Sequence, residues 1–345
     1  MLMSSTEPMQ ASTLSQYKGN LPRHLIALSR YSQSSAMQQL HEAYHHRALR
    51  MSFEPYISMI GEGVRLTELA ERLGISKQSC NQTANQMEKA GYIQREPDPL
   101  DGRGKVVVLT GQGKTLLKDG YKVITTIIAE FDRHIGAKKL TTLTKVLLKL
   151  AGGLSLPNFE HISTTEIEPT LLGALLPRCS DHVMQRLMTL TIAKGHPGLK
   201  MSHGTVLTLI GSKNVRIREI AKQQAVTKQA VSAIVKDLEG LGYVTRKADP
   251  DYPRQNLLLL TDRGSQLIAD SVDSVKEVER EYEAILGCTA LGQLKSISKE
   301  LYLGLELEAQ FQETSTTDLQ QLARQLKLQL SEDGVKALIS LLEKD

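Results

Sequence analysis

The strongest hydrophobic pattern in this chain lies between Val64 and Gly113, where apolar side chains recur at helical spacing in two short runs. The first run, Thr67–Leu73, is closed by Gly74, and the second, Lys77–Ala90, follows a serine suited to cap a helix. One face of the second run is apolar, whereas the opposite face carries amides, hydroxyls and a lysine and is poor in acidic residues. The pattern predicts two helices joined by a tight turn.

A two-stranded hairpin is predicted directly after these helices. Tyr92–Arg95 and Val106–Leu109 have strand composition, and the Pro/Gly/Asp-rich stretch Asp98–Lys105 forms the loop between them. A second helix that presents amides and hydroxyls suits the DNA major groove, and Arg103 and Lys105 at the loop tip suit an adjacent minor groove or phosphates. On the helix pair alone, a plain packing element is an equal alternative.

The whole segment occurs twice. Adding 151 to each position gives Val215–Gly264 without a gap, and the register continues to Gly136/Gly287 and Leu140/Leu291. The matched pairs are Val64/Val215, Arg65/Arg216, Glu68/Glu219, Ala70/Ala221, Lys77/Lys228, Gln78/Gln229, Glu88/Glu239, Gly91/Gly242, Tyr92/Tyr243, Arg95/Arg246, Asp98/Asp249, Pro99/Pro250, Arg103/Arg254, Thr110/Thr261 and Gly113/Gly264. This pattern indicates the duplication of a whole domain.

The repeated segment resembles the MarR family of winged-helix transcription regulators. The resemblance is carried by the helix end Glu88–Tyr92, the wing Asp98–Arg103 and the Leu-Thr-x-x-Gly sequence that ends at Gly113. It implies a mainly α fold with small β-hairpin wings. Family members are usually homodimers whose first and last helices interlock, so two copies in one chain imply an intramolecular pseudo-dimer formed through terminal helices.

The duplication predicts a domain order. We expect a first MarR-like domain over residues 1–150, a linker over 151–170, a second MarR-like domain over 171–311 and a C-terminal helical extension over 312–345. Residues 1–20 are polar, and we expect them to be mobile. The extension is expected to be a helical hairpin packed on the body, with a partner-binding tail as the alternative. Further helices are predicted at Leu21–His46, Arg50–Met59, Thr110–Arg133 and Lys138–Leu150.

The predicted DNA-binding residues lie on both second helices and both hairpins. In the first copy they are Ser76, Lys77, Gln78, Ser79, Asn81, Gln82, Asn85, Arg95, Arg103 and Lys105, and in the second Thr227, Lys228, Gln229, Ser232, Lys236, Arg246 and Arg254. The second wing departs from the family pattern at Tyr252, where an Asp usually orients the wing Arg; Asp251 is a candidate substitute. A basic stripe of Lys77, Arg95, Arg103, Lys228, Arg246 and Arg254 on one face would favour DNA binding.

The two reading helices differ in chemistry. Asn81 and Gln82 each offer an amide suited to adenine, whereas the aligned positions carry Ser232 and Ala233, and Lys236 replaces Asn85. We therefore predict a sequence-specific duplex DNA-binding regulator, acting as a repressor on an imperfect-repeat operator and modulated by a small-molecule effector. The alternative from another class is a regulator-derived interaction module that no longer binds DNA.

Composition sets bounds on this prediction. A hydrophobic content of 41% supports two cores in 345 residues, and a net charge of +4 neither demands nor excludes nucleic acid. The three cysteines make no disulfide framework or metal pair, which indicates a reducing, cytoplasmic location. No signal peptide or membrane-spanning segment is predicted. Further pairing of the pseudo-dimer stays open.

Several chemical signals compete with DNA binding. His41-Glu42-x-x-His45 matches the HExxH zinc-hydrolase signature, in which both histidines lie on one helical face, but no third ligand follows. A solvated cluster of His41, His45 and His46 is expected, with a regulatory metal site as the alternative. Neither an enzyme nor a bound cofactor is predicted. Cys80 is expected in the core, and a redox role for Cys179 is a minor alternative.

Overall fold

The computed structural model describes residues 11–99, 101–157, 159, 168–210, 215–223, 227–249 and 256–307. The chain forms two compact units, each treated separately below. The first-copy unit is Leu28–Cys179, and the second-copy unit combines Met1–Ala27 with Ser180–Asp345. The units therefore do not coincide with the two sequence copies at their N-terminal edges. The predicted extension 312–345 lies outside the described residues.

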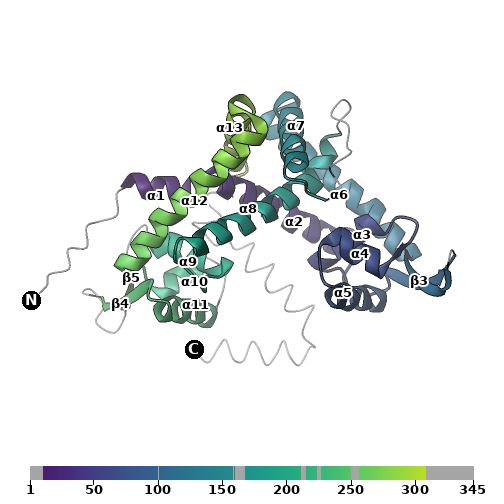
Figure 1. Cartoon of the computed structure of the whole chain (residues 1–345), viewed down its shortest axis with the longest axis horizontal. Helices are drawn as coiled ribbons and strands as arrows, with labels where there is room; N and C mark the ends of the chain where they lie inside the picture. Colours follow the sequence, from purple (N-terminus) through teal and green to yellow (C-terminus); the bar gives the residue numbers. More distant parts are fainter. Residues whose placement is uncertain are drawn as a thin grey trace, which may run out of the picture. The chain divides into compact units, whose positions relative to one another are not determined.

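The first-copy unit is mainly helical with one small sheet (Figure 1). Its elements are α2 (Leu21–Glu42, from Leu28 on), η1 (Met51–Phe53), α3 (Glu54–Ile60), β1 (Val64–Arg65), α4 (Leu66–Leu73), α5 (Lys77–Lys89), β2 (Ile93–Asp98), β3 (Asp101–Leu109), α6 (Gly111–Ile135), α7 (Ala137–Gly153), η2 (Pro169–Leu171) and the start of α8 (Leu172–Ala193). The predicted helix–turn–helix–hairpin order is confirmed.

The second-copy unit repeats this order within its own described residues (Figure 1). Its elements are α1 (Ala11–Lys18), the start of α2, the rest of α8, α9 (Met201–Ile210), α10 (Ile217–Gln223), α11 (Lys228–Gly240), β4 (Val244–Ala248), β5 (Asn256–Leu260), α12 (Asp262–Leu286) and α13 (Cys288–Gly304). The mainly α fold with small β-hairpin wings is thus present in both units.

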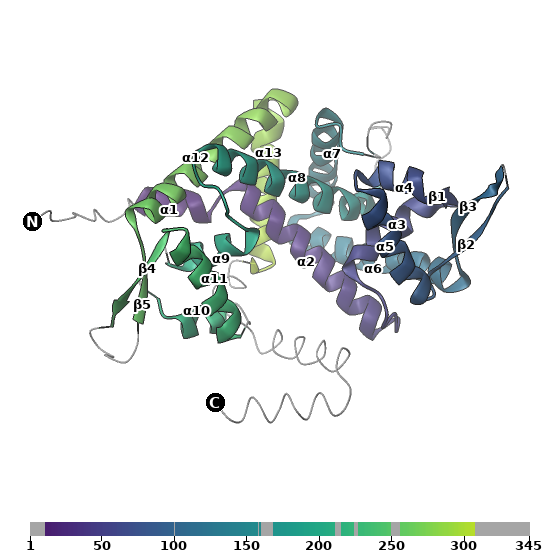
Figure 2. The ribbon, with the colours of Figure 1, turned by 60° about the horizontal axis from the view of Figure 1, so that its bottom comes forward.

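The hairpin of the first-copy unit projects beyond its helices (Figure 2). Its sheet has the order β1-β3-β2, with Val64 paired to Val107 and Ile93 to Leu109. The predicted loop Asp98–Lys105 is too long, because β2 reaches Asp98 and β3 begins at Asp101. Pro97 interrupts the run without ending it, since β2 is an edge strand and an edge tolerates a missing backbone donor.

A threonine and a glycine fix the point where each hairpin meets the following helix. Thr110 caps α6 by accepting from the Gly113 amide at 3.1 Å, and its hydroxyl donates to the Gly91 carbonyl at 2.6 Å. A Cβ on Gly113 would lie 2.1 Å from the Tyr92 carbonyl oxygen. Thr261 and Gly264 repeat this arrangement in the second-copy unit, which explains why the Leu-Thr-x-x-Gly sequence is duplicated.

Each winged helix has its own apolar core. In the second-copy unit the cluster joins α9, α10, α11, the hairpin and α12, and its buried members are Val206, Leu207, Ile210, Val215, Ile220, Ala221, Val231, Val235, Leu238, Tyr243, Val244, Leu258, Leu267 and Ile268. In the first-copy unit, Cys80, Ala84 and Met87 on α5 are each fully buried. The buried cysteine confirms the prediction that it packs in the core.

The N-terminal prediction was wrong in part. Residues 11–18 form α1, which packs against α12, and the Tyr17 side chain contacts the second-copy core cluster. The segment has little apolar character of its own, so its order comes from tertiary packing that a local pattern does not reveal.

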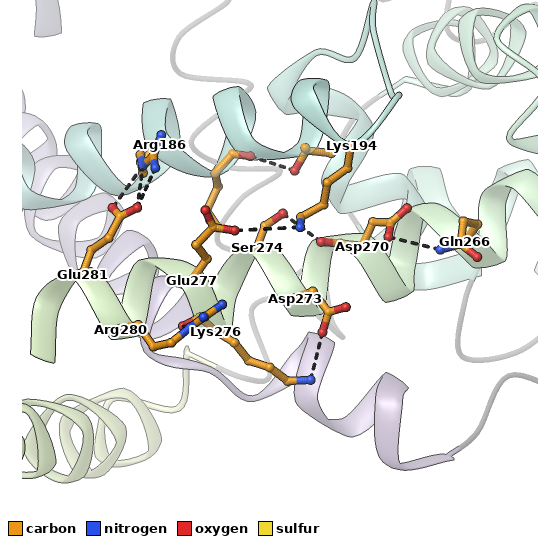
Figure 3. A network of polar contacts seen from close by, with 12 residues as sticks. Arg186, Lys194, Gln266, Asp270, Asp273, Ser274, Lys276, Glu277, Arg280 and Glu281 are labelled. Carbon is orange, nitrogen blue, oxygen red and sulfur yellow. Dashed lines mark hydrogen bonds and ion pairs between the residues drawn. The ribbon is translucent and has the colours of Figure 1, made fainter.

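Ion pairs join α8 to α12 within the second-copy unit (Figure 3). Arg186 forms a bidentate pair with Glu281, with Nε 3.0 Å from Oε2 and Nη2 2.6 Å from Oε1, and Lys194 lies 3.8 Å from Glu277. The pKa of Glu281 is lowered, mainly by its hydrogen bond from Arg186.

In the part of the chain that the structure describes, none of the helices has the length and apolar character that a membrane span requires.

Candidate nucleic-acid interface

Helix α5 presents a polar face opposite its buried one. Ser76 caps the helix by accepting a hydrogen bond from the Ser79 amide at 3.1 Å, as its position before the helix predicted. Gln78, Gln82 and Asn85 are exposed and spaced by four and three residues, so they share one side of the helix. Lys77, Ser79 and Asn81 are also exposed. The helix can therefore offer several amides and hydroxyls to a ligand at once.

Helix α11 has the same geometry with different chemistry. Thr227 caps it by accepting from the Ala230 amide at 3.1 Å, while Val231, Val235 and Leu238 are buried. The exposed predicted residues are Thr227, Lys228, Gln229 and Lys236, and Ser232 is half-buried. This face is more cationic and has fewer amides than that of α5, as the sequence comparison predicted.

In the first-copy unit, the hairpin residue Arg95 binds to side chains along one side of α5. Its guanidinium forms an ion pair with Glu88 through Nη1, and Nη2 donates to Oδ1 of Asn81 at 3.1 Å and of Asn85 at 2.6 Å. The three acceptors follow the spacing i, i+4, i+7, so they line one side of the helix. The hairpin and the reading helix are thereby fastened along two turns.

In the second-copy unit the equivalent arginine makes a simpler contact. Arg246 donates from Nε and Nη2 to the two carboxylate oxygens of Glu239, at 2.8 and 3.0 Å. The positions aligned with Asn81 and Asn85 carry Ser232 and Lys236, and a lysine cannot accept a hydrogen bond. The amide contacts of Arg95 thus have no counterpart at these two positions.

A second arginine anchors the base of each hairpin, and the local sequence pattern does not predict this role. Arg65 forms an ion pair with the buried Asp98, and Arg216 binds the buried Asp249 with Nε at 2.7 Å and Nη2 at 2.5 Å from Oδ2. The pKa of Arg216 is raised, chiefly by this hydrogen bond. Both members of each pair recur at the 151-residue offset, and that joint repetition is the signal that could have revealed the pairing.

The expected basic stripe can be followed only in part. Lys77, Lys105 and Lys228 are exposed, whereas Arg95 and Arg246 are neutralised by the glutamates on their own reading helices. The side chain of Arg103 and all of Arg254, with Asp251 and Tyr252, lie outside the described residues. The roles of all these residues in DNA binding stay predictions.

The His41/His45/His46 cluster is not the solvated group that was expected. Helix α2 ends at Glu42 and His45 has φ of 59°, so His41 and His45 do not share a helical face. His46 is buried with its Nε2 3.2 Å from Asp119 Oδ2, and His41 Nε2 lies 3.0 Å from the Leu49 carbonyl. Within the described part of the chain, no three His, Cys, Asp or Glu side chains gather to hold a metal ion.

The buried His–Asp pair recurs in the second-copy unit. His196 Nε2 lies 2.8 Å from Asp270 Oδ2, and its Nδ1 lies 3.2 Å from the Tyr243 hydroxyl. In the first copy, burial by itself raises the pKa of Asp119, but hydrogen bonds from Lys122 and His46 outweigh it and hold that pKa below its usual value. These histidines are part of the interior between the hairpin and the long helix that follows it.

The cysteines are expected to differ sharply in reactivity. Cys80 and Cys179 are buried, and burial raises the pKa of the Cys179 thiol to about 12, which argues against redox sensing there. Cys288 is exposed.

Iodoacetamide at neutral pH should therefore modify Cys288 alone in the native protein, and mass spectrometry should find Cys80 and Cys179 modified only after unfolding. Rapid native labelling of Cys179 would contradict its burial.

Comparison with known proteins follows the same division of the chain. Residues 56–104 and 198–252 each match the model of the MarR family. The transcriptional regulator Tm0710 of Thermotoga maritima matches at 23% identity and a TM-score of 0.33, covering 39% of this chain and 94% of its own. A mutant of Staphylococcus aureus MepR bound to an oligodeoxyribonucleotide matches at 19% identity, with a TM-score of 0.31, covering 38% and 93%. PcaV of Streptomyces coelicolor, in complex with its natural ligand, matches at 16% identity and a TM-score of 0.28, covering 36% of this chain and 87% of its own.

Helices α5 and α11 are each N-capped and followed by a hairpin, and an arginine of each hairpin bonds to the helix before it. These features define a protein with two winged helix-turn-helix domains. One region in each domain matches the MarR family model, which supports a tandem arrangement of two MarR-like domains in one chain.

Proposed function

We propose that this chain is a transcription regulator that binds duplex DNA through α5 and α11, each lying in a major groove. The observation that carries the proposal is the pair of N-capped helices with exposed polar faces, each backed by a hairpin. Such a helix reads base edges with its amides while lysines and the hairpin take phosphates. Repression by blocking a promoter and modulation by a small-molecule effector belong to this proposal as what the family resemblance implies.

The test of this function is a selection of bound duplexes from random DNA, followed by a base-by-base substitution scan. We expect an imperfect repeat whose stricter half is read by the amide-rich α5. Gln82→Ala should relax that half by about 5- to 150-fold in base discrimination, since a bidentate contact contributes roughly 1–3 kcal/mol. Preferences in the other half should not change. A strict palindrome would contradict the assignment, and failure to select any duplex would favour the interaction-module alternative.

The proposal includes a single-chain pseudo-dimer, and packing inside each unit supports it. In the second-copy unit, α1 packs on α12, Arg23 Nη2 donates to Thr208 Oγ1 at 3.1 Å, and the rings of His24 and Tyr302 lie 4.8 Å apart. In the first-copy unit, η2 packs on α6 and α7, immediately before α8 begins. The segment that precedes each winged helix thus packs with the long helices of the other sequence copy.

Cleavage of the linker is expected to leave the two halves associated. A protease site placed among residues 160–167 should yield fragments that co-elute in size-exclusion chromatography, because each fragment has packed its first residues into the other unit. The intact linker sets an effective concentration on the order of millimolar, so the uncut chain should behave as a dimer-equivalent at any dilution. Fragments that separate while each stays folded would show that the domains are independent.

A further inference from the structure

The amides of α5 that contact Arg95 have a fixed orientation. Arginine has only donors, so the atoms of Asn81 and Asn85 that face it are their carbonyl oxygens, at 3.1 and 2.6 Å from Nη2. The NH2 group of each amide therefore points away from the guanidinium. Both asparagines are exposed, whereas the Arg95 side chain retains only 21% of its exposure.

This orientation changes what the two asparagines can recognise. A bidentate contact to adenine needs the amide oxygen to accept from N6 while the NH2 donates to N7. In Asn81 and Asn85 the oxygen faces Arg95, so the atom of the amide that is turned away from the guanidinium and presented to a base is the NH2 donor. Guanine presents two acceptors in the major groove, N7 and O6, and gives the best match to a donor-only side chain.

We infer that Arg95 is a positioning residue that orients Asn81 and Asn85 as hydrogen-bond donors, so that α5 selects guanine at the base positions that these two side chains contact. The inference rests on the proposed function, since it concerns base selection by the same helix. It replaces the expectation from sequence that Asn81 binds adenine through both the oxygen and the NH2 of its amide. Gln82, whose side chain is exposed on the neighbouring row, keeps that role.

Helix α11 lacks the amide contacts that orient Asn81 and Asn85 on α5. Arg246 holds both oxygens of Glu239, and Lys236 and Ser232 stand where the two asparagines would be. Loss of Arg246 therefore removes an Arg–Glu pair without changing the orientation of an amide. The chain itself thus contains the matched control for Arg95.

The experiment is a base-substitution scan on the selected duplex with wild type, Arg95→Met and Arg246→Met. Wild type should prefer guanine over adenine by about 5- to 150-fold at the two base positions that Asn81 and Asn85 contact. Arg95→Met should reduce this preference below about threefold or shift it to adenine, because the released amides can rotate. Arg246→Met should lower affinity for all sites alike and leave both base preferences in place. Thermal unfolding of each variant verifies that it is folded.

Two further measurements separate positioning from a merely structural role. Asn85→Asp keeps an oxygen for Arg95 but loses the outward donor, so it should stay folded and lose the guanine preference under that residue. In ¹⁵N spectra of the free protein, the side-chain NH2 signals of Asn81 and Asn85 should be displaced from random-coil chemical shifts in wild type and move toward those shifts in Arg95→Met.

The outcomes are distinguishable. If wild type selects no duplex, the proposed function and this inference are both wrong. If wild type selects a site but Arg95→Met keeps its guanine preference, or if Asn85→Asp does, the inference alone is overturned.

Discussion

Gly113→Ala is expected to destabilise the first-copy unit by about 3 kcal/mol, at the upper end of the usual cost of overpacking. The new methyl group would lie 2.1 Å from the Tyr92 carbonyl oxygen and 3.2 Å from Leu109 Cδ2. The first of these contacts is with backbone, which cannot move aside without breaking the 3.1 Å hydrogen bond from the Thr110 amide to Tyr92. The melting temperature should fall by about 6–12 °C for a unit of this size.

The matched control lies on the same helix. A Cβ on Gly120 would meet nothing within 4 Å, so Gly120→Ala should be neutral or stabilise the unit by about 0.5–1 kcal/mol through helix propensity. Gly264→Ala should reproduce the loss in the second-copy unit, where the carbonyl of Tyr243 is equally close. Differential scanning calorimetry gives both values, and a Gly113→Ala melting temperature equal to that of wild type would show that the close approach is absent in solution.

Arg216→Ala is the second substitution with a large expected effect. It would remove the guanidinium that binds the Asp249 carboxylate, which is 2% exposed, at the base of the second hairpin. A buried carboxylate that loses its cation costs on the order of 3 kcal/mol, and the substitution should appear as an early melting transition. Arg72→Ala is the control, because its pair with Glu68 has both side chains nearly half exposed and contributes less than about 0.5 kcal/mol.

The effect of Arg216→Ala should depend on pH with a definite sign. The Arg216 guanidinium favours the ionised form of the carboxylates that it binds, so its removal costs most at neutral pH, where those carboxylates are charged. In wild type, burial raises the pKa of Glu219, but hydrogen bonds from Arg216 outweigh it and lower that pKa. This contribution to stability is present at neutral pH and lost on acidification. The difference between the two proteins should therefore shrink in acid, and a difference that grows would contradict the pairing.

The local elements could be predicted from the sequence because their signals are local. The expected helices Thr67–Leu73 and Lys77–Ala90 correspond to Leu66–Leu73 and Lys77–Lys89. Ser76 supplies a cap, and Gly74, with φ of 65°, supplies the left-handed residue that ends α4. These choices involve residues within four positions of one another, which is the range that periodicity and capping report.

The contacts that define the candidate site join residues far apart in the chain, and periodicity does not report them. The buried His46 contacts Asp119, which lies 73 positions later in the chain, and Arg65 forms an ion pair with Asp98 across 33 positions. The orientation of Asn81 depends on Arg95 in a different element. The duplication was the one long-range signal available: it repeats Arg65/Arg216 with Asp98/Asp249, and Arg95/Arg246 with Glu88/Glu239.

The composition of the two compact units has a consequence for synthesis on the ribosome. The second-copy unit contains Met1–Ala27 together with Ser180–Asp345, so its first segment emerges long before the residues on which it packs. At about 5–20 residues per second, the intervening 28–179 take roughly 8–30 s to translate, and during that time Tyr17 and its neighbours have no native partner. The first-copy unit likewise waits for η2 and the first turns of α8 before it is complete. Because contacts between residues so far apart in the chain close slowly, each unit stays incomplete, with part of its core uncovered, until the segments encoded later have been synthesised.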